Sequence, residues 1–569
     1  MPQDAITLSK TAKELNDIIA GAKINRINQP TADEIVLSLY CKSGAYKLCV
    51  CANAISARVG FTTIEKKNPT TPTGFCMLLR KHLLNATVKT VVTVESERIV
   101  KITFDGKNEF LEPIEKQLYC EIMGKYSNVI FCENEIICGT LKTSLLEIGK
   151  ERALLTGVRY ALPKSQGKCS IFDKEKSIEI LNAFSSGDLS DYLFNNFQGF
   201  SLITAQEITF REFGKTVFEK NITLSADFYN KICDFANAGV SQPNVVSSLD
   251  KLTDFYFCDY KSVKGNKFYF DSLLQAETYF FDTKQLVREF NELKNKLTST
   301  VKSKLKKEEK KLQIIREKEL ACSDAETLRQ LGELIISNIY KIKRGDKTVT
   351  VENYYDDNNQ LEIKLDEQLS PNANAQKYFK RYNKLKNTLK AIGPQKEQAE
   401  YECEYLQSVL AELQIAQNVA DLTAIEDELK ESGIIKVDVK VKTSKKQEKI
   451  EYRIFEYNGY TIYAGKNNVQ NDKLTFSARP SDLWLHTKDY HSAHVVIPCG
   501  SSHIPDEILQ LAAEICAYYS EAKNGDKVPV DYTQRKYVKK PPKSKYGAVL
   551  YTDFKTVYVT PNAHKNLEK

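Results

Sequence analysis

The sequence predicts a multidomain α+β protein in which a mixed α/β domain at each end flanks a helical region and a long antiparallel coiled-coil stalk. Three observations lead to this prediction. The chain has 569 residues, which is several times the size that one hydrophobic core supports. Runs rich in valine, isoleucine and aromatic residues, which are typical of strands, occur toward both ends. Between them, apolar residues recur every three or four positions, which indicates helices that pack along one stripe.

The first region, residues 1–174, is predicted to be a mixed α/β domain. The segment TLSKTAKELNDIIAG carries an apolar stripe, and Thr7 or Ser9 can cap it as a helix. Four runs rich in β-branched residues follow, separated by Gly, Asn or Pro. Between them GFCMLLRKHLLNA has helical spacing, and its other face carries Arg80 and Lys81.

Residues 175–283 are predicted to be mainly helical. The segment LSDYLFNNFQGFSLITAQEITFREFG contains two apolar helical patches that meet at Gly199. Two short helices joined by a glycine turn are the plan of a helix-hairpin-helix, which offers backbone N–H groups to a phosphate. A plain helical hairpin fits the same pattern.

Residues 284–435 are predicted to form two coiled-coil arms. Apolar residues step by threes and fours from Phe290 to Ile315, and again from Tyr378 to Leu413, among Lys, Glu, Asn and Gln. The stretch between the arms, about residues 335–372, combines β-like alternation with turn residues, and a helix cannot run on through Pro371. The simplest arrangement is an antiparallel stalk with a small middle module between its arms.

Residues 445–569 are predicted to form a second α/β domain. YTIYAGKNNVQND and LWLHTKDYHSAHVVI are typical of strands around polar turns, and PDEILQLAAEICAYYSEA is typical of a helix. AVLYTDFKTVYVTP is predicted to be a final hairpin.

Composition and charge exclude several classes of protein. Hydrophobic residues make up 42% and charged residues 27% of the chain, as in globular proteins. No segment approaches the roughly 18 apolar residues of a membrane helix, and no signal peptide is evident, so a cytoplasmic protein is predicted. The 14 cysteines contain no C-x-x-C pair, which favours free thiols over disulfides or structural zinc. Neither a cofactor nor a metal is predicted, and the net charge of +7 permits a polyanionic partner.

The segment DLWLHTKDYHSAHVVI holds the only tryptophan of the chain, Trp484, and three of its six histidines, His486, His491 and His494. A metal site, a catalytic base and a nucleic-acid platform are the chemistries to weigh. Trp484 and His486 alternate along a predicted strand and share one face. Beside Lys488 they could stack on bases and pair with phosphates. The alternatives are a structural histidine and a tryptophan in the core.

A basic loop, RKYVKKPPKSKYG, lies close to the C-terminal end. Its lysines can neutralise phosphates while the interleaved tyrosines offer stacking faces, although a solvated loop has the same composition. The candidate RNA-binding lysines are Lys536, Lys539, Lys540, Lys543 and Lys545.

Two further features are ambiguous. Glu97 and Arg98 are adjacent within a β-rich run, where they form either a surface pair of little energy or an arginine held for a phosphate or base. Met1-Pro2 would expose an N-terminal proline, which is the Schiff-base nucleophile of formamidopyrimidine-DNA glycosylases. The glutamate expected next is Gln3, and no zinc finger follows, so no catalytic residue is predicted.

Several segments, taken together and in order, resemble one family across nearly the whole chain, the NFACT proteins. The segments are FCMLLRKHL (75–83), EIMGKYSNVI (121–130), LSPNANAQKYFKRYNKLK (369–386), GKNNVQNDKLT (465–475), DLWLHTKDYHSAHVVI (482–497), VPVDYTQRKYVKKP (528–541) and KTVYVTP. The resemblance implies an NFACT-N domain with a glycosylase-like fold, a helix-hairpin-helix region, a coiled-coil stalk and an RNA-binding NFACT-R domain.

The same resemblance implies a function in ribosome quality control without catalysis by the protein itself. Bacterial members bind obstructed large ribosomal subunits that carry peptidyl-tRNA, and they recruit alanyl-tRNA for C-terminal alanine tailing of the stalled chain. The implied partners are the large ribosomal subunit, tRNA (alanine tRNA in the family) and a small RqcP-like RNA-binding protein. A monomer associated with ribosomes, without membrane contact, is expected.

The implied tRNA site falls at the N-terminal end of the chain. The Asp-Arg pair of the family corresponds to Glu97 and Arg98, so the charge is kept on a longer side chain. Arg80 and Lys81 are further tRNA-binding candidates.

In the C-terminal domain the family pattern matches at His486, Lys488 and His494 but not at His491. We therefore expect Trp484, these three residues and the five lysines of the basic loop to bind RNA. A fibronectin-binding surface adhesin and a DNA glycosylase-like enzyme are the alternative functions; the first requires secretion, and the second requires the missing zinc finger.

Overall fold

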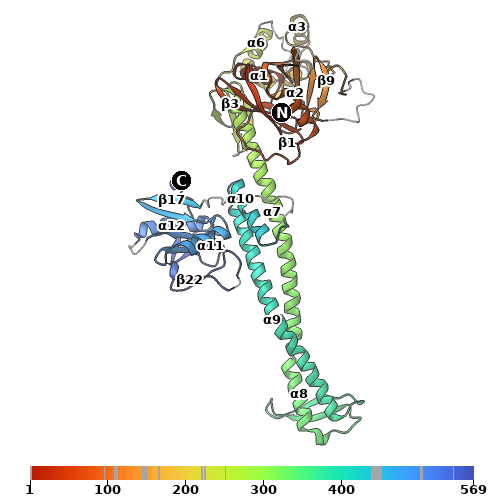
Figure 1. Cartoon of the computed structure of the whole chain (residues 1–569), viewed down its shortest axis with the longest axis vertical. Coiled ribbons are helices and arrows are strands. Elements are labelled where there is room, and N and C mark those ends of the chain that lie inside the picture. Colours follow the sequence, from red (N-terminus) through yellow and green to blue (C-terminus); the bar gives the residue numbers. More distant parts are fainter. Residues whose placement is uncertain are drawn as a thin grey trace. The chain divides into compact units, whose positions relative to one another are not determined.

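The computed structural model describes residues 3–94, 96–107, 113–142, 152, 154–164, 167–219, 222, 224, 226–249, 251–436, 452–499, 504–542 and 544–569. It contains two compact units, Met1–Val287 and Arg288–Lys569. Each unit has helices, strands and hydrophobic cores of its own (Figure 1), which confirms the predicted multidomain α+β class. None of the helices in the described ranges is long and apolar enough to cross a membrane.

The first unit is built on an antiparallel sheet of nine strands in the order β4-β3-β2-β1-β5-β6-β7-β8-β9. Helices α1 (Ala5–Ile19) and α2 (Gly74–Leu83) pack on it over an aliphatic core. Asp4 caps α1 by accepting the Thr7 N–H at 2.8 Å, so the cap precedes the predicted Thr7 or Ser9. The strands are β1 (Lys23–Thr31), β2 (Glu34–Cys41), β3 (Gly44–Cys51), β4 (Arg58–Phe61), β5 (Thr87–Thr93), β6 (Ile99–Lys107), β7 (Pro113–Glu121), β8 (Asn128–Glu133) and β9 (Ile136–Thr140).

A largely helical part completes the first unit around a core rich in phenylalanine. Helices α4 and α5 meet at Gly199, whose φ of +90° lies in the left-handed region that favours glycine. A Cβ on Gly199 would also lie 3.3 Å from the carbonyl oxygen of Ser96. The elements are α3 (Lys174–Asn182), β10 (Gly187–Asp188), α4 (Leu189–Asn196), α5 (Leu202–Phe213), β11 (Val217–Phe218), α6 (Ala226–Asn237), β12 (Asn244–Ser248), β13 (Lys251–Tyr256) and β14 (Asn266–Tyr269).

Two long helices, α7 (Leu273–Ala321) and α9 (Pro371–Ile415), pair in the second unit (Figure 1). The pairing is antiparallel, because early α7 meets late α9: Lys294 donates to the Gln414 carbonyl, whereas Arg316 pairs with Glu400. Apolar side chains spaced by threes and fours fill the seam. Between the arms lie α8 (Ala325–Ser337), β15 (Thr348–Asn353) and β16 (Asn359–Lys364), and α10 (Val419–Glu431) packs back on α9.

The C-terminal part of the second unit is a six-stranded sheet in the order β17-β18-β20-β19-β21-β24, covered by α12 (Asp506–Tyr518). The short strands β22 (Val538–Lys539) and β23 (Leu550–Tyr551) form a separate pair. The six strands are β17 (Arg453–Tyr457), β18 (Tyr460–Ala464), β19 (Leu483–Thr487), β20 (Val495–Ile497), β21 (Val528–Gln534) and β24 (Lys555–Val559).

Two local predictions in this domain were wrong. The segment after β18 is not strand-like but forms helix α11 (Asn468–Ser477), because Asn467 caps it by accepting the Gln470 N–H at 2.9 Å. The final hairpin is not formed either, because β23 pairs with β22 and β24 pairs with β21. Asp531 of β21 holds both segments, since it accepts hydrogen bonds from Tyr551 Oη at 2.9 Å and Thr556 Oγ1 at 2.6 Å.

Candidate nucleic-acid interface

Trp484 belongs to the core of the C-terminal domain. Its side chain on β19 is fully buried with Leu474, Val496 and Val538, and its Nε1–H donates to Thr475 Oγ1 at 3.1 Å. The apolar ring is therefore packed and its N–H is hydrogen-bonded inside the protein. This corrects the expectation that Trp484 binds RNA by stacking; the core alternative holds.

The histidines next to Trp484 pack against it, His494 buried and His486 half-buried. The ring of His486 stacks on Trp484 with centroids 5.7 Å apart, and buried His494 lies 2.7 Å from Thr475 Oγ1 through its Nδ1. Burial lowers the pKa of His486 to about 4 and holds that of His494 well below its usual range. A lowered pKa disfavours the charged form of both imidazoles, and their role in RNA binding stays a prediction. Within the described residues no group of three or more His, Cys, Asp or Glu is placed to hold a metal ion.

The predicted RNA-binding lysines fall into two sets. Lys488, Lys536 and Lys539 are exposed. Lys540, which is also exposed, and half-buried Lys545 pair with carboxylates of Asp472 and Glu402, the second at 2.6 Å. Lys543 lies outside the described residues. The unpaired exposed lysines can contact phosphates directly in this structure. Lys540 and Lys545 can do so only when their ion pairs with Asp472 and Glu402 break.

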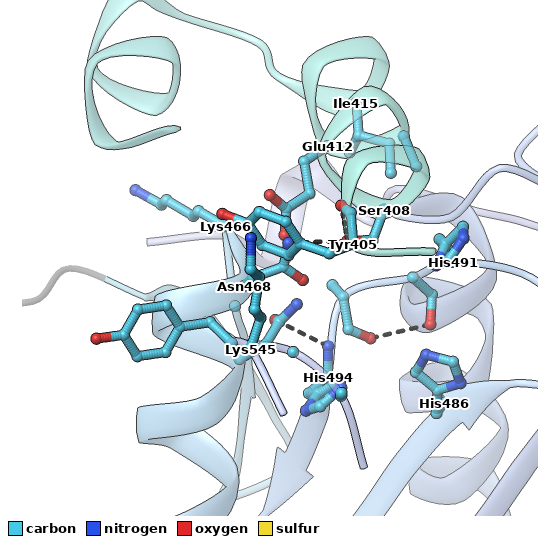
Figure 2. Close-up of a pocket in the computed structure, with 18 of the residues that line it drawn as sticks. Tyr405, Ser408, Glu412, Ile415, Lys466, Asn468, His486, His491, His494 and Lys545 are labelled. Atoms are coloured by element: carbon cyan, nitrogen blue, oxygen red, sulfur yellow. Dashed lines mark hydrogen bonds between the residues drawn. The ribbon is translucent and has the colours of Figure 1, made fainter. Parts of the chain in front are cut away.

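A pocket lies where α9 meets the C-terminal domain, within the second unit. Figure 2 shows Tyr405, Ser408 and Glu412 on one helix, opposite Lys466, Asn468 and Lys545. His491, His486 and His494 also line the pocket (Figure 2). The pocket is thus lined by acids and tyrosines from the stalk, and by amides, cations and histidines from the C-terminal domain.

Carboxylates beside this pocket are buried. Burial raises the pKa of Glu428 to about 7, against hydrogen bonds from Tyr405, Asn468 and the Val469 N–H that favour its charged form. Burial and the charge of Glu428 also raise the pKa of Glu412 well above its usual range. Deeper in the contact, Arg453 pairs with Asp421 at 3.2 Å, with both side chains almost fully buried.

In the first unit, Glu97 and Arg98 lie in the turn between β5 and β6. Glu97 Oε1 accepts a hydrogen bond from Gln198 Nε2 at 2.5 Å, and Ser96 contacts the Gly199 turn. Burial lowers the pKa of Lys168, and the positive charge of Arg98 lowers it further, so these two cations are neighbours. The structure thereby joins two features that the sequence presented separately, the Glu97–Arg98 pair and the glycine turn between α4 and α5.

The remaining tRNA-binding candidates lie on α2. Arg80 is half-buried and donates to the Ile27 carbonyl at 2.8 Å and to Asn28 Oδ1 at 3.3 Å. Its guanidinium therefore ties α2 to β1, and tRNA binding by Arg80 stays a prediction. Lys81 is exposed in the last turn of the helix.

Sequence reasoning missed the acids that meet the C-terminal domain, Glu402, Glu412, Asp421 and Glu428. In the sequence they look like the solvated polar positions of a coiled coil. Lys168 and Gln198, beside the Glu97–Arg98 turn, were also missed, because no local pattern separates them from other loop residues. Only the fold brings these side chains to their partners.

The similarity to known proteins extends over nearly the whole chain. A family model described as NFACT N-terminal and middle domains matches residues 4–449, and one described as NFACT protein RNA binding domain matches residues 450–553. Rqc2 homolog RqcH of Bacillus subtilis (strain 168) is 34% identical over 564 residues, 97% of this chain and 96% of that protein. Rqc2 homolog RqcH of Streptococcus suis (strain 05ZYH33) is 34% identical over 583 residues, 99% of each. The solved C-terminal part of the fibronectin/fibrinogen-binding protein from Streptococcus suis aligns with 49% of this chain and 99% of its own, at 32% identity and a TM-score of 0.40.

Proposed function

The chain belongs to the NFACT family, and from this premise we propose that it is a ribosome-associated quality control factor. In this proposal it binds obstructed large ribosomal subunits that carry peptidyl-tRNA and recruits alanyl-tRNA. The stalled chain then receives a C-terminal alanine tail that marks it for degradation. Ribosomal RNA forms the peptide bonds, so the protein positions substrates and is not itself a catalyst.

The observation that carries the proposal is the surroundings of Arg98. A guanidinium with a second cation nearby can bind a phosphate, and Glu97, which precedes Arg98 in the same turn, accepts a hydrogen bond from Gln198. The adjoining turn at Gly199 precedes α5, whose N-terminus already holds the carboxylate of Asp4 through the Ser201 N–H at 3.2 Å. A tRNA backbone has the matching chemistry, and the position corresponds to the tRNA-determining pair of the family.

The C-terminal domain supports the RNA side of the proposal. Its match to an RNA-binding family model spans residues 450–553, and exposed Lys488, Lys536 and Lys539 can neutralise phosphates. Such contacts hold RNA without reading its sequence. In this proposal the domain supplies affinity for ribosomal RNA, and the first unit supplies the contact with tRNA.

The test is Arg98→Ala in the full chain, with Arg26→Ala as the control, because Arg26 is exposed on β1 and carries the same charge. Loss of a charged contact should weaken tRNA binding about ten- to a hundredfold and abolish alanine tails on stalled chains, read by mass spectrometry. The melting temperature should stay close to that of the parent, since a half-exposed side chain is changed. Normal tails with Arg98→Ala, or equal losses with Arg26→Ala, would refute the assignment.

The same preparation distinguishes the adhesin alternative. Recovery of the protein with fibronectin, and not with large ribosomal subunits, would favour that function over the one proposed.

A further inference from the structure

The contact between the stalk and the C-terminal domain has an unusual chemical character. Three polar pairs of this contact set an acid of α9 or α10 against a cation or amide of the domain: Glu402 with Lys545 at 2.6 Å, Asp421 with Arg453 at 3.2 Å, and Glu428 with Asn468 at 3.3 Å. In each pair the negative member belongs to the stalk. Asn468 also donates to Ser408 Oγ of α9 at 3.1 Å. The domain therefore presents positive groups and N–H donors toward the stalk, as it would toward a polyanion.

The donors include the N-terminus of a helix. Asn467 caps α11 through the Gln470 N–H, which leaves the first N–H groups, those of Asn468 and Val469, without a partner inside the helix. These two N–H groups favour the charged forms of Glu412 and Glu428. The N-terminus of α11 and its N–H groups thus face carboxylates of the stalk, although burial outweighs these donors and raises the pKa of both carboxyl groups.

The carboxylates are poorly matched to this position. Glu428 is 2% exposed, yet among the described residues one of its carboxylate oxygens, Oε2, has no hydrogen-bond partner. The carboxylate oxygens of Glu412 are likewise buried. Burying a charged group without full pairing is costly, so this contact is weaker than a permanent interface of the same size would be. An anion with more acceptor oxygens than a carboxylate, such as a phosphodiester, would satisfy these donors better.

We propose that the face of the C-terminal domain formed by Arg453, Lys466, Asn468 and Lys545 is a binding site for the phosphodiester backbone of RNA, and that the acids of α9 and α10 occupy this site as a mimic of RNA. The inference rests on the proposed function, because it deepens the RNA-binding role of that domain. RNA and the stalk compete for the same groups, so RNA that reaches this face displaces the domain from the stalk. Lys539, which is exposed on β22, gives the RNA a first contact in the loop that also holds Lys545.

RNA is favoured over an acidic protein as the partner for two reasons. The domain matches an RNA-binding family model, and the site is continuous with the lysines of the same loop. Tyr546 is exposed beside Lys540, with the ammonium 5.1 Å from its ring centroid, and offers a stacking face for a base.

The experiment is a double-mutant cycle on the full chain, with a fluorescein-labelled oligouridylate as the probe and affinity measured at several salt concentrations. Glu402→Gln removes the competing charge and should raise affinity about two- to fivefold, the factor expected for one partly exposed ion pair. Lys545→Ala should lower affinity and reduce the salt slope by somewhat under one unit, about 0.7–0.9 per phosphate contact. In the Lys545→Ala background, Glu402→Gln should have no further effect.

The matched control is Glu397→Gln, which removes an exposed acid from the same helix. An equal gain with Glu397→Gln would show only a general effect of net charge and would overturn the proposal. So would an unchanged or lower affinity with Glu402→Gln, or a gain that persists without Lys545. If the parent chain binds no RNA at all, the proposed function fails; if it binds RNA but the cycle shows no coupling, only the mimicry fails.

Discussion

Replacing Trp484 by alanine tests whether the signature tryptophan supports the fold or contacts RNA. The side chain is fully buried against Leu474, Val496 and Val538 and donates its N–H to Thr475. Removing so large a core side chain leaves a cavity and should lower the free energy of unfolding of the C-terminal domain by about 3–5 kcal/mol. Trp484→Phe keeps most of the apolar contact and loses only the N–H donor, so it should cost clearly less.

Hydrogen exchange of α12 amides, followed by mass spectrometry, is the appropriate assay. It reports on this one domain, whereas circular dichroism of the whole chain is dominated by the long helices. A loss of about 3–5 kcal/mol corresponds to exchange that is faster by about two to three and a half orders of magnitude. Peptides from β6 and β7 in the first unit should exchange as in the parent, which serves as the internal control.

The contrary result is equally specific. If α12 exchange is unchanged in Trp484→Ala while RNA affinity falls at an unaltered salt slope, Trp484 stacks on a base and its assignment to the core is wrong.

Two further predictions concern charge. Lys539→Ala should weaken binding to all RNA sequences alike and reduce the salt slope by somewhat under one unit, because an exposed lysine contacts phosphates only. The control is Lys13→Ala, which removes an exposed lysine of α1. Identical salt slopes for the two variants would contradict the role of Lys539. The contact of the stalk with the C-terminal domain should weaken as pH rises, because burial raises the pKa of Glu428 from its ordinary 4.5 to about 7. The stability that protonated Glu428 contributes to this contact is fully present below about pH 4.5 and is lost as pH rises through about 7. Oligouridylate affinity should accordingly rise between pH 5.5 and 8. Glu428→Gln should flatten this pH profile, although the charged or titratable groups Glu412, Tyr405, Asp472 and Arg453 surround the site. An unchanged profile in Glu428→Gln would show that the pH dependence does not come from Glu428.

The elements that the sequence predicted well are those set by a repeated local pattern. The two arms of the stalk follow from apolar residues such as Leu297, Val301, Leu406 and Leu413, which fill the seam between α7 and α9. A long stripe of this kind has few alternatives to helix pairing, so sequence spacing is enough. The helical patches on both sides of Gly199 were visible for the same reason, together with the conformational freedom of glycine.

The elements that the sequence did not predict lack a long repeated pattern or depend on distant partners. Helix α11 is short and polar, and only the adjacent cap at Asn467 marks its start. The last two strands pair with β22 and β21 and not with each other. That choice of partners is not visible in a local window of sequence.

The candidate site likewise contains features that the sequence predicted and features that it did not. Trp484 and His486 were correctly placed on one face of a strand, but Trp484 is fully buried and His486 is half-buried beside the pocket. Alternation along a strand predicts which residues share a face and says nothing of which face is buried. Likewise Glu402 and Glu428 cannot be distinguished from solvated stalk residues until the fold sets them against Lys545 and Asn468.

Capture of RNA by the full chain tests the central claim most directly. The tagged parent and the Arg98→Ala variant would be crosslinked in cells and purified, and the RNA bound to each would be sequenced. The account predicts that the parent enriches large-subunit ribosomal RNA and alanine tRNA, and that Arg98→Ala keeps the ribosomal RNA while losing the tRNA. Absence of ribosomal RNA from the parent, or tRNA recovery that Arg98→Ala leaves intact, would contradict it.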